Sequence, residues 1–417
     1  MILPVCVLFA GACLVGRTDK ARAIDYAPGE EMVFSVALTN ARPFAADGVR
    51  FRWTREGDDG KKETGEQPFS PTSPLVVRTS LDRPGFVKLA ARLEDAKGNR
   101  IASFNGGAGV EPEKLRSVDE PDDFDSFWVK RKERLANVPL AAELKEHPSS
   151  DPAVRVHSFS VACAGPRPVT GTLTVPAKAG KFPAEITFQA FSEDYVQKPP
   201  KGGPHDRLRM HINAHGYELG REAEYYKGFY ASIRSGDAPF AHDRKQNESA
   251  DTAYFSGMTY RVMRALQYLK SRPEWDGAHL TARGTSMGGM QAIWAASLDS
   301  DVTLVKAEVP WCCDVGGRGT LGRLVDGYCP KETKALRYFD PVNLARRISP
   351  KCRVEIVRAG LGDYCCPPSG LAILYNNLPC AASIRWVQGS THGYVPPADV
   401  GNPAFALSKN PQDKKEK

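Results

Sequence analysis

Hydrophobic and polar residues alternate in short runs over the first hundred residues of the chain. The runs 32–38, 49–53 and 87–93 place every second apolar side chain on one face, which is typical of β-strands with one buried face. Turn residues such as Asp-Asp-Gly at 58–60 separate the runs. Because short strands joined by regular turns pack as two sheets, the pattern predicts an immunoglobulin-like β-sandwich over residues 17–115.

The apolar spacing changes after this region, and helical periods appear among the strands. An amphipathic helix is predicted over residues 124–135, two alternating runs follow within residues 154–175, and residues 258–269 form a second predicted helix. Strands that alternate with helices favour a mostly parallel sheet covered by helices on both faces, so we predict an α/β domain over residues 116–404. Its predicted strands are 184–191, 208–214, 279–282, 303–309, 353–359 and 383–387.

The two ends of the chain fit neither domain. Residues 1–16 carry no charge and are mostly apolar, but they are too short to span a membrane. They are either an export signal, with Ala-Arg-Ala at 21–23 as the cleavage site, or a first strand. The export interpretation places the protein outside the cell or in the periplasm. Residues 405–417 end in a run of polar and charged residues and predict a mobile tail.

Composition limits the kinds of partner. The net charge of +7 is modest for 417 residues, and no run of lysine and arginine is interleaved with aromatic residues, so nucleic-acid binding is not predicted. The ten cysteines fit disulfides in an exported protein as well as buried free thiols. The adjacent pairs 312–313 and 365–366 lack the C-x-x-C spacing of zinc sites, so no metal is predicted.

One short motif joins a predicted strand to a predicted helix. Residues 284–289 read Gly-Thr-Ser-Met-Gly-Gly, which places Ser286 between glycines at a strand-to-helix turn. This context fits a nucleophile elbow, where small neighbours let strand and helix come close and the helix N-terminus directs N–H groups at developing negative charge. Alone, the motif also fits a glycine-rich turn with a solvent-exposed serine, but its flanks favour the catalytic interpretation.

A catalytic serine needs a base, and the base needs an acid that orients it. His392 is the only histidine after Ser286, and it follows the last predicted strand of the α/β domain. Asp363 is the aspartate that directly follows a predicted apolar strand. The order Ser, Asp, His is that of the α/β-hydrolase fold, whose catalytic loops meet at the carboxyl edge of the parallel strands. We therefore predict a triad of these residues that needs no metal or cofactor.

The oxyanion hole of such an enzyme is built from backbone N–H groups. One should come from Met287, the residue after the nucleophile. The second should come from the loop after the strand that ends at Phe191. Tyr217, on the loop of the following strand, is the rival donor.

Four stretches of the chain carry a resemblance to a known family. They are Pro-Asp-Asp-Phe-Asp-Ser-Phe-Trp at 121–128, the motif at 284–289, Tyr-Phe-Asp-Pro-Val-Asn-Leu at 338–344, and 360–369, where Gly-Leu-Gly-Asp runs into Cys-Pro-Pro-Ser. Over about residues 121–397 the chain resembles the acetyl xylan esterase and cephalosporin-C deacetylase family. The resemblance implies an α/β-hydrolase that removes acetyl groups from sugars and related small esters. It makes Ser286 the nucleophile, Asp363 the orienting acid and His392 the base.

The chain departs from the pattern of this family at three places. Residues 189–191 read Gln-Ala-Phe where the family has His-Gly-Tyr, and residues 215–217 read His-Gly-Tyr where the family has Arg-Gly-Gln. Gly393 stands where the catalytic histidine of the family is followed by glutamate. These departures and the added N-terminal sandwich leave the oligomeric state and the particular sugar open.

We therefore predict a secreted serine carboxylesterase that deacetylates plant or algal oligo- or polysaccharides through an acetyl-enzyme. Hydrolysis of another ester or of a peptide bond is the alternative within the same mechanism, because a triad does not define the leaving group. A carbohydrate-binding protein with an inactive hydrolase domain is the alternative from another class.

Overall fold

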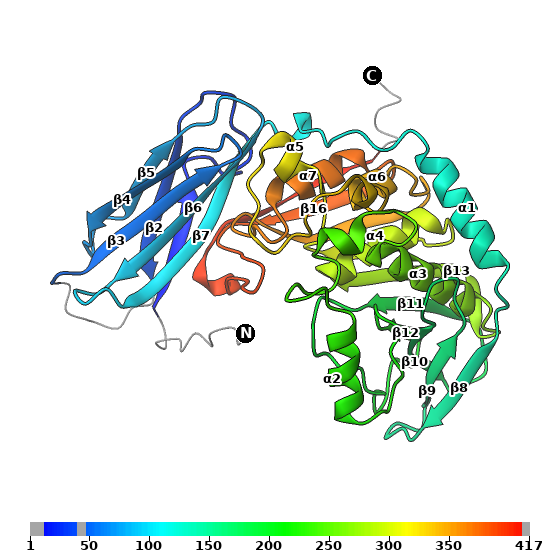
Figure 1. The fold of residues 1–417 in the computed structure, drawn as a ribbon. Helices are drawn as coiled ribbons and strands as arrows, with labels where there is room; N and C mark the ends of the chain where they lie inside the picture. The colour runs from blue at the N-terminus through cyan, green and yellow to red at the C-terminus, as the bar shows by residue number, and fades with distance from the viewer. Residues whose placement is uncertain (1–11, 40–46, 411–417) are drawn as a thin grey trace.

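Within residues 12–39 and 47–410, which the computed structural model describes, the chain forms three β-sheets (Figure 1). The N-terminal strands make a three-stranded sheet in the order β1-β2-β5 and a four-stranded sheet in the order β4-β3-β6-β7, and all their pairings are antiparallel. The strand bounds are β1 Cys13–Thr18, β2 Met32–Thr39, β3 Arg50–Gly57, β4 Lys62–Pro68, β5 Leu75–Thr79, β6 Gly85–Glu94 and β7 Arg100–Val110.

The two N-terminal sheets share one hydrophobic core. Every second residue at the start of β2, namely Met32, Phe34 and Val36, is buried in it, as the alternation in the sequence predicts. Phe51 of β3 and Leu89 of β6 are buried in the same core. The alternation arises because successive side chains of a strand point to opposite faces of its sheet.

The structure changes the assignment of both chain ends. Residues 13–16 lie in β1, which pairs with β2, as the first-strand interpretation requires, while residues 1–11 lie outside the described residues. Ala23 is buried and its carbonyl accepts the N–H of Gly109, so a cut after Ala23 would detach β1 from its sheet. The predicted tail is wrong for its first part, because residues 405–409 belong to β17, a strand paired with β16.

The third sheet is mixed and has the strand order β17-β16-β15-β14-β13-β11-β12-β10-β9-β8. The strands from β16 to β12 run parallel, and the outer strands join them antiparallel. The bounds are β8 Ala142–His147, β9 Val154–Val161, β10 Val169–Pro176, β11 Phe182–Phe188, β12 Leu208–Ile212, β13 Trp275–Thr285, β14 Leu304–Glu308, β15 Arg353–Gly360, β16 Ala381–Val387 and β17 Ala404–Lys409.

Helices α3, α4 and α7 pack against this large sheet, and α6 packs on α4 and α7 (Figure 1). Every residue of α4 is buried, because all of its residues except Gln291 are apolar or small and it lies between the sheet and other helices. No helix in the described part of the chain is long and apolar enough to cross a bilayer. The bounds are α1 Phe124–Ala136, α2 Ala223–Ser232, α3 Tyr254–Lys270, α4 Met287–Leu298, α5 Gly317–Leu321, α6 Pro341–Ala345 and α7 Pro368–Asn377, with 3₁₀ turns η1 Pro112–Lys114, η2 Arg244–Asn247, η3 Lys334–Tyr338 and η4 Ala398–Val400.

The prediction of helices on both faces of this sheet is wrong for its central strands. Burial alternates along β13 to β16, although parallel strands covered on both faces are buried throughout. The side chains of one face are buried, and those of the opposite face reach solvent. The exposed ones are Arg283, Lys306, Val357 and Arg385, and their buried neighbours are Ala282, Val305, Ile356 and Ile384.

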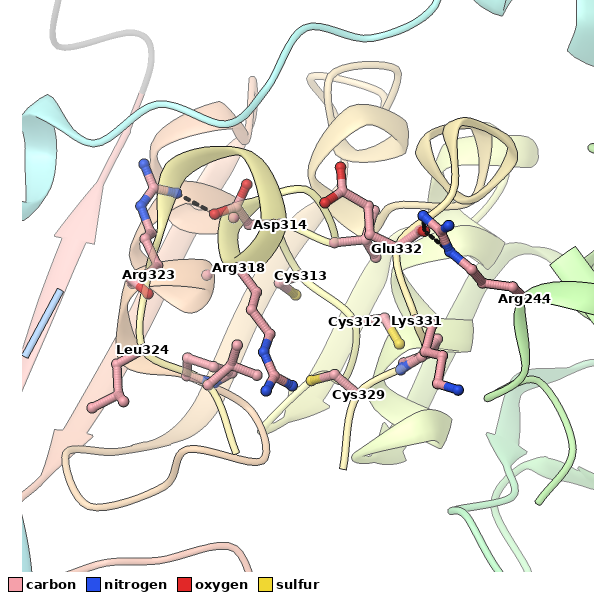
Figure 2. Close-up of a pocket in the computed structure, with 18 residues that line it drawn as sticks. Arg244, Cys312, Cys313, Asp314, Arg318, Arg323, Leu324, Cys329, Lys331 and Glu332 are labelled. Atoms are coloured by element: carbon pink, nitrogen blue, oxygen red, sulfur yellow. Dashed lines mark hydrogen bonds and ion pairs between the residues drawn. The ribbon is translucent and has the colours of Figure 1, made fainter. Parts of the chain in front are cut away.

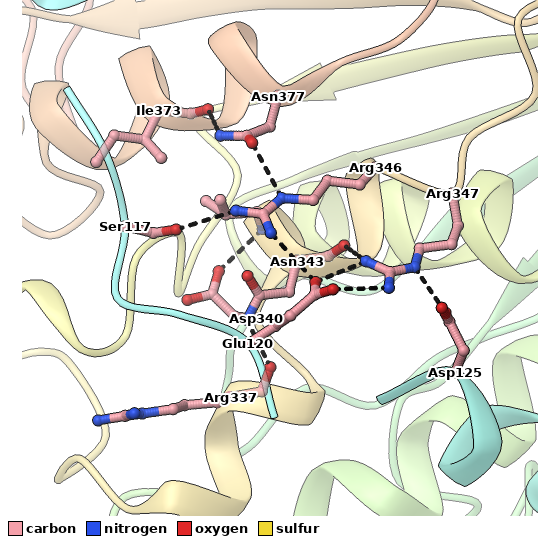
Figure 3. Close-up of polar contacts among 11 residues, drawn as sticks. Ser117, Glu120, Asp125, Arg337, Asp340, Asn343, Arg346, Arg347, Ile373 and Asn377 are labelled. Atoms are coloured by element: carbon pink, nitrogen blue, oxygen red, sulfur yellow. Dashed lines mark hydrogen bonds and ion pairs between the residues drawn. The ribbon is translucent and has the colours of Figure 1, made fainter. Parts of the chain in front are cut away.

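The segment between the N-terminal sheets and the large sheet is held by charge pairs. Arg347, just after α6, donates to both carboxylate oxygens of Glu120 at 2.6 and 2.8 Å (Figure 3). Its Nε donates to Asp125 in the first turn of α1 at 2.8 Å. Arg346 also lies within 3.3 Å of Glu120. These contacts fix the start of α1 against the helices that cover the sheet.

The N-terminal sheets also contact the large sheet directly. Phe86 of β6 belongs to the core of the large sheet and packs on Trp386 of β16, with ring centroids 5.6 Å apart. Gly362 lies so close to β7 that a Cβ there would be 2.1 Å from the carbonyl oxygen of Asn105. The backbone next to Asp363 is therefore in contact with the N-terminal sheets.

Candidate active site

Ser286 occupies a strained turn between β13 and α4. Its φ of 56° and ψ of −119° lie outside the regions that L-residues ordinarily adopt, which is the strained conformation expected of a nucleophile elbow. A Cβ on Gly284 would lie 2.4 Å from the backbone of Gly288, and a Cβ on Gly288 would lie 2.3 Å from the carbonyl oxygen of Phe188. The flanking glycines are thus required by the close approach of β13, α4 and β11.

Asp363 and His392 form a hydrogen-bonded pair. The Oδ2 atom of the buried Asp363 lies 3.0 Å from Nδ1 of His392. The other carboxylate oxygen accepts the N–H groups of Cys365 and Cys366 at 3.1 and 3.0 Å. Backbone donors of this kind fix the orientation of the carboxylate. The structure therefore brings together two of the three residues predicted as a triad.

The surroundings of His392 determine its proton affinity. Burial lowers the pKa of the imidazole. The Asp363 carboxylate and the Cys365 thiol raise this pKa by more than burial lowers it, so the net shift is upward. The pKa of the Cys365 thiol is lowered, because the Cys366 thiol and His392 stabilise its thiolate against the effect of burial. Thiol and imidazole thus favour each other's charged forms.

The loop that carries His392 is attached to the elbow by a buried arginine. Arg358 of β15 donates from Nε to Glu308 at 2.7 Å and from Nη1 to the carbonyl of Thr391 at 2.9 Å. The other carboxylate oxygen of Glu308 accepts the hydroxyl of Thr285, the residue before Ser286, at 2.9 Å. Burial raises the pKa of Glu308, but Arg358 and Thr285 lower it by more. This chain of contacts joins the loop that carries His392 to the strand that leads to Ser286.

Sequence reasoning missed this network, although a signal was present. Glu308 and Arg358 interrupt two runs that were assigned as apolar strands. A charged residue near the carboxyl end of a strand, next to a predicted catalytic loop, would have marked both positions as candidates. Both were instead included in strands 303–309 and 353–359 without a role.

Ser286 does not contact His392 through a hydrogen bond in this structure. Its hydroxyl has no hydrogen-bond partner among the described residues, and the residue is 6% exposed. Catalytic hydrogen bonds in enzymes without substrate are often long and tighten in the complex. The elbow and the Asp363–His392 pair both lie at the carboxyl edge of the parallel strands.

The predicted oxyanion donors have different surroundings. Met287 is the first residue of α4, so its N–H has no intrahelical acceptor. Phe191 lies on the loop after β11, and its ring stacks on Phe240 with centroids 4.4 Å apart. The rival Tyr217 is engaged elsewhere, because its N–H donates to Asn213 at 3.3 Å. Tyr217 is therefore a poor second donor.

Asp340 resembles a possible orienting acid in sequence but has another function in the fold. Its buried carboxylate caps the N-terminus of α6 by accepting the N–H of Val342 at 2.9 Å (Figure 3). It also accepts the N–H groups of Asp314 and Val315 at 3.1 and 2.7 Å. Burial and the charge of Asp314 raise the pKa of Asp340 to about 7, against these backbone donors. Asp340 is thus a structural residue.

Two cavities lie near the candidate site. One of about 580 Å³ is lined by the thiols of Cys312, Cys313 and Cys329 together with several arginines (Figure 2). The other, of about 510 Å³, opens on the exposed face of the large sheet. Its lining includes Phe191, Thr285 and Glu308, so it reaches the residues next to the elbow. Neither lining includes Ser286 or His392.

The cysteines of the described residues are free thiols. All nine of them are unpaired with another cysteine, and Cys6 lies outside the described residues. Of the two alternatives that the sequence left open, the described part of the chain therefore shows buried or half-buried thiols.

Comparisons with known proteins agree on one family. The model of the acetyl xylan esterase family matches residues 113–405. The chain is 25% identical over 315 residues to the acetyl esterase Axe7A of Xylanibacter ruminicola, which covers 72% of this chain and 69% of that protein.

Solved structures show the same relationship at the level of the fold. Acetyl xylan esterase 1 of a Thermoanaerobacterium species has a TM-score of 0.57 at 20% identity, over 70% of this chain and 95% of its own. An acetyl xylan esterase of a Paenibacillus species has a TM-score of 0.54 at 20% identity, over 68% and 94% respectively. These likenesses establish an α/β-hydrolase-like fold with a large mixed sheet.

Proposed function

Because the chain belongs to the acetyl xylan esterase family, a family of carboxylic ester hydrolases, we propose that it deacetylates carbohydrate through a triad of Ser286, His392 and Asp363. The family match over residues 113–405 contains all three. The observation that carries the assignment is the 3.0 Å contact between Asp363 and Nδ1 of His392. This contact leaves Nε2 free to act on a nucleophile at the elbow.

The proposed reaction has two halves. Ser286 Oγ attacks the acetyl carbonyl carbon while His392 accepts the hydroxyl proton, and the carbonyl electron pair moves onto oxygen. When this intermediate collapses, the bond to the sugar oxygen breaks and His392 returns the proton to that oxygen. Water then attacks the acetyl-enzyme with His392 again as base, which releases acetate and restores the serine.

The negative oxygen of each intermediate needs hydrogen-bond donors. We assign these to the N–H groups of Met287 and Phe191, since the first lies at the N-terminus of α4 and the second follows β11. Donors aimed at a developing oxyanion each contribute about 10²–10³ in rate. No step of this mechanism requires a metal or a cofactor.

We propose acetylated oligo- or polysaccharide as the substrate and a location outside the cell or in the periplasm. In this proposal the catalytic domain runs from residue 116 to the end of β17 at residue 409, and the immunoglobulin-like sandwich runs from the start of β1 at residue 13 to residue 115. The two antiparallel N-terminal sheets around one core support the second assignment.

Replacement of the nucleophile tests the mechanism. Ser286→Ala should abolish acetate release from acetylated xylo-oligosaccharides while the protein stays folded, because loss of a triad nucleophile costs on the order of 10⁶ in kcat. A fluorophosphonate should label the wild type stoichiometrically, and peptide mapping should place the label on Ser286. Inactivation of the wild type by EDTA, or a wild type that takes no label at Ser286, would overturn the proposal.

The same experiment separates the remaining alternatives. Labelling at Ser286 with turnover of longer acyl or methyl esters alone would keep the triad and remove the acetyl assignment. Binding of xylo-oligosaccharides with neither labelling nor turnover would favour a carbohydrate-binding protein. Acetylated xylo-oligosaccharides and p-nitrophenyl acetate should therefore be compared in parallel.

A further inference from the structure

Two adjacent thiols lie beside the histidine of the proposed triad. The sulfur atoms of Cys365 and Cys366 and one ring nitrogen of His392 all lie within 4.8 Å of one another. Both cysteines are buried, whereas the His392 side chain is 35% exposed, so solvent reaches the group through the imidazole. This is the one cluster of three or more potential metal ligands within the described residues.

The backbone holds the two thiols in place without help from a ligand. The N–H groups of Cys365 and Cys366 both donate to one oxygen of Asp363, so the chain turns tightly around that carboxylate. Two prolines follow directly, and Pro368 begins α7. Because proline fixes φ, the end of this turn has little freedom. The cluster is thus largely preorganised.

The residue types in this cluster are those that bind zinc and similar thiophilic cations. Two thiolates and an imidazole provide three ligands of a tetrahedral site with an open fourth position. Bonds of about 2.0–2.3 Å place tetrahedral ligands roughly 3.5–3.8 Å apart. Because the ligand atoms lie within 4.8 Å of one another, the side chains need to close by at most about 1.3 Å. The Asp363 contact at Nδ1 is also the usual support of a metal-bound histidine, since it orients the ring for binding through the other nitrogen.

We propose that Cys365, Cys366 and His392 bind a thiophilic divalent cation such as Zn²⁺, and that binding inhibits the esterase. The two thiols release their protons when they bind the cation, which takes the place of those protons on sulfur. The imidazole lone pair is then bound to metal and no longer accepts the proton of Ser286. The inhibitory half of this proposal rests on the proposed function of His392, but the binding half does not.

The spacing of cysteines alone does not reveal such a site. Adjacent cysteines lack the C-x-x-C pattern, and the third ligand comes from the loop after another strand, β16. The site exists because β15 and β16 are parallel neighbours whose following loops meet at one edge of the sheet.

Metal binding is measured first, independently of activity. The purified full chain, reduced with a phosphine and freed of metal, is dialysed against Zn²⁺ and separately titrated with Co²⁺. We expect one Zn²⁺ per chain and, with Co²⁺, a thiolate-to-cobalt charge-transfer band in the near ultraviolet. Cys365→Ser and Cys366→Ser should each weaken Zn²⁺ binding by at least about 100-fold, since even loss of a supporting residue costs 10–100-fold.

A matched thiol elsewhere is the control for these variants. Cys163 is half-buried and free but lies outside the cluster, so Cys163→Ser should bind Zn²⁺ as the wild type does. If a serine variant in the cluster fails to fold, alkylation of the wild type provides the second measurement. Zn²⁺ should then protect Cys365 and Cys366, and not Cys163, from modification, as read by peptide mapping.

Activity is measured on the same samples. Zn²⁺ should inhibit hydrolysis of p-nitrophenyl acetate by the wild type, and EDTA should restore it, whereas Cys365→Ser should require at least about 100-fold more Zn²⁺. Absence of the thiolate–cobalt band, or equal Zn²⁺ affinity in the wild type and both cluster variants, would overturn the metal site. Bound metal with full activity would instead support the site and contradict His392 as the base.

Discussion

The side chain of Gln388 binds the backbone of Gly107 twice, with Nε2 donating to its carbonyl at 2.8 Å and Oε1 accepting its N–H at 2.9 Å. Gln388 follows β16 of the large sheet, and Gly107 lies in β7 of an N-terminal sheet. A Cβ on Gly107 would lie 2.6 Å from the carbonyl oxygen of Leu361, close to Asp363 in sequence. The N-terminal sheets therefore contact the backbone of the loop that carries Asp363.

Gly107→Ala tests the importance of this contact. The added methyl group would lie 2.6 Å from the carbonyl oxygens of both Leu361 and Val87, so the backbone must shift on both sides. We therefore expect a loss of about 1–3 kcal/mol in the free energy of unfolding. Gly228→Ala is the control, because no atom lies within 4 Å of its added methyl group and alanine favours the helix α2. Thermal unfolding of the two variants and the wild type provides the comparison. Equal unfolding temperatures for Gly107→Ala and the wild type would contradict the expectation.

Removal of the N-terminal sheets tests whether they take part in the chemistry. Every residue of the proposed triad and oxyanion hole lies beyond residue 188. Folded molecules that lack residues 17–110 should therefore hydrolyse a small soluble ester at a rate within about tenfold of the wild type. This corresponds to a change below roughly 1.4 kcal/mol in activation free energy. The truncated chain should be less stable, because Trp386 and Gln388 lose their partners. Activity is normalised to the fluorophosphonate-labelled fraction. A folded but inactive truncation would contradict this prediction.

Asp363→Asn tests the orienting acid. An asparagine keeps the shape but favours the wrong tautomer of His392, so kcat should fall by as much as about 10⁴-fold while the fold is retained. Asp340→Asn is the matched control, because Asp340 caps α6 and does not contact His392. We expect it to change the unfolding temperature rather than kcat. A dead Asp340→Asn beside a fully active Asp363→Asn would reverse the assignment.

The sequence predicts those parts of the fold that depend on local pattern. Alternation located β2, β3 and β6, and a helical period located α3. The glycines at 284 and 288 marked the elbow, because the close approach of strand and helix leaves no room for a side chain. Asp363 and His392 were found from their position after predicted strands, and the structure brings them into contact.

Features that depend on contacts between distant segments could not be predicted in this way. The strand at 404–409 reads Ala-Phe-Ala-Leu-Ser-Lys, and it was grouped with the polar residues that follow it. Its apolar residues Phe405 and Leu407 pack against the core of the large sheet, and its pairing with β16 comes from a distant segment. The open face of the large sheet is visible only as charges at every second position, as in Lys306 and Arg385, which were counted within apolar runs. The contact of Gly107 with Leu361 arises from packing of an N-terminal sheet against the loop after β15, and no spacing along the chain encodes it.

The pH dependence of activity should reflect the raised pKa of His392. The base works only when neutral, so an upward shift moves the acid limb of kcat/KM above the ordinary value of 6.5. Cys365→Ser removes one of the groups that raise the pKa, so its acid limb should lie at lower pH than that of the wild type. The measurement is kcat/KM for p-nitrophenyl acetate against pH, in metal-free buffer.

The contribution of His392 to stability changes with pH in the opposite direction to its contribution to activity. A histidine whose pKa is higher in the folded protein stabilises the fold below its unfolded pKa, and this contribution is lost as pH rises through the folded value. The unfolding temperature of the wild type should therefore exceed that of His392→Ala by less as the pH rises above about 6.5. A pH-independent difference in unfolding temperature between the two proteins would contradict the raised pKa.

Arg358 should act as a positioning residue for the base loop. Its guanidinium joins Glu308 at 2.7 Å to the carbonyl of Thr391 at 2.9 Å, but it does not contact the reacting atoms of the proposed mechanism. Arg358→Met should lower kcat about 10²-fold, which is the cost of a misplacement of about 1 Å, and leave KM for a small ester nearly unchanged. It should also destabilise the protein, because the Glu308 carboxylate, whose side chain is 34% exposed, is left without its partner.

The double variant Arg358→Met, Glu308→Leu separates positioning from stability. Replacing both members of a buried ion pair with apolar residues often restores stability, because no uncompensated charge remains. The loop at Thr391 still lacks its donor in this variant, so kcat should stay low while the unfolding temperature recovers. Arg358→Lys should regain only part of kcat, since a single ammonium group does not reproduce the fork that reaches Glu308 and Thr391 together. Recovery of kcat in parallel with stability in the double variant would show that Arg358 has a purely structural role.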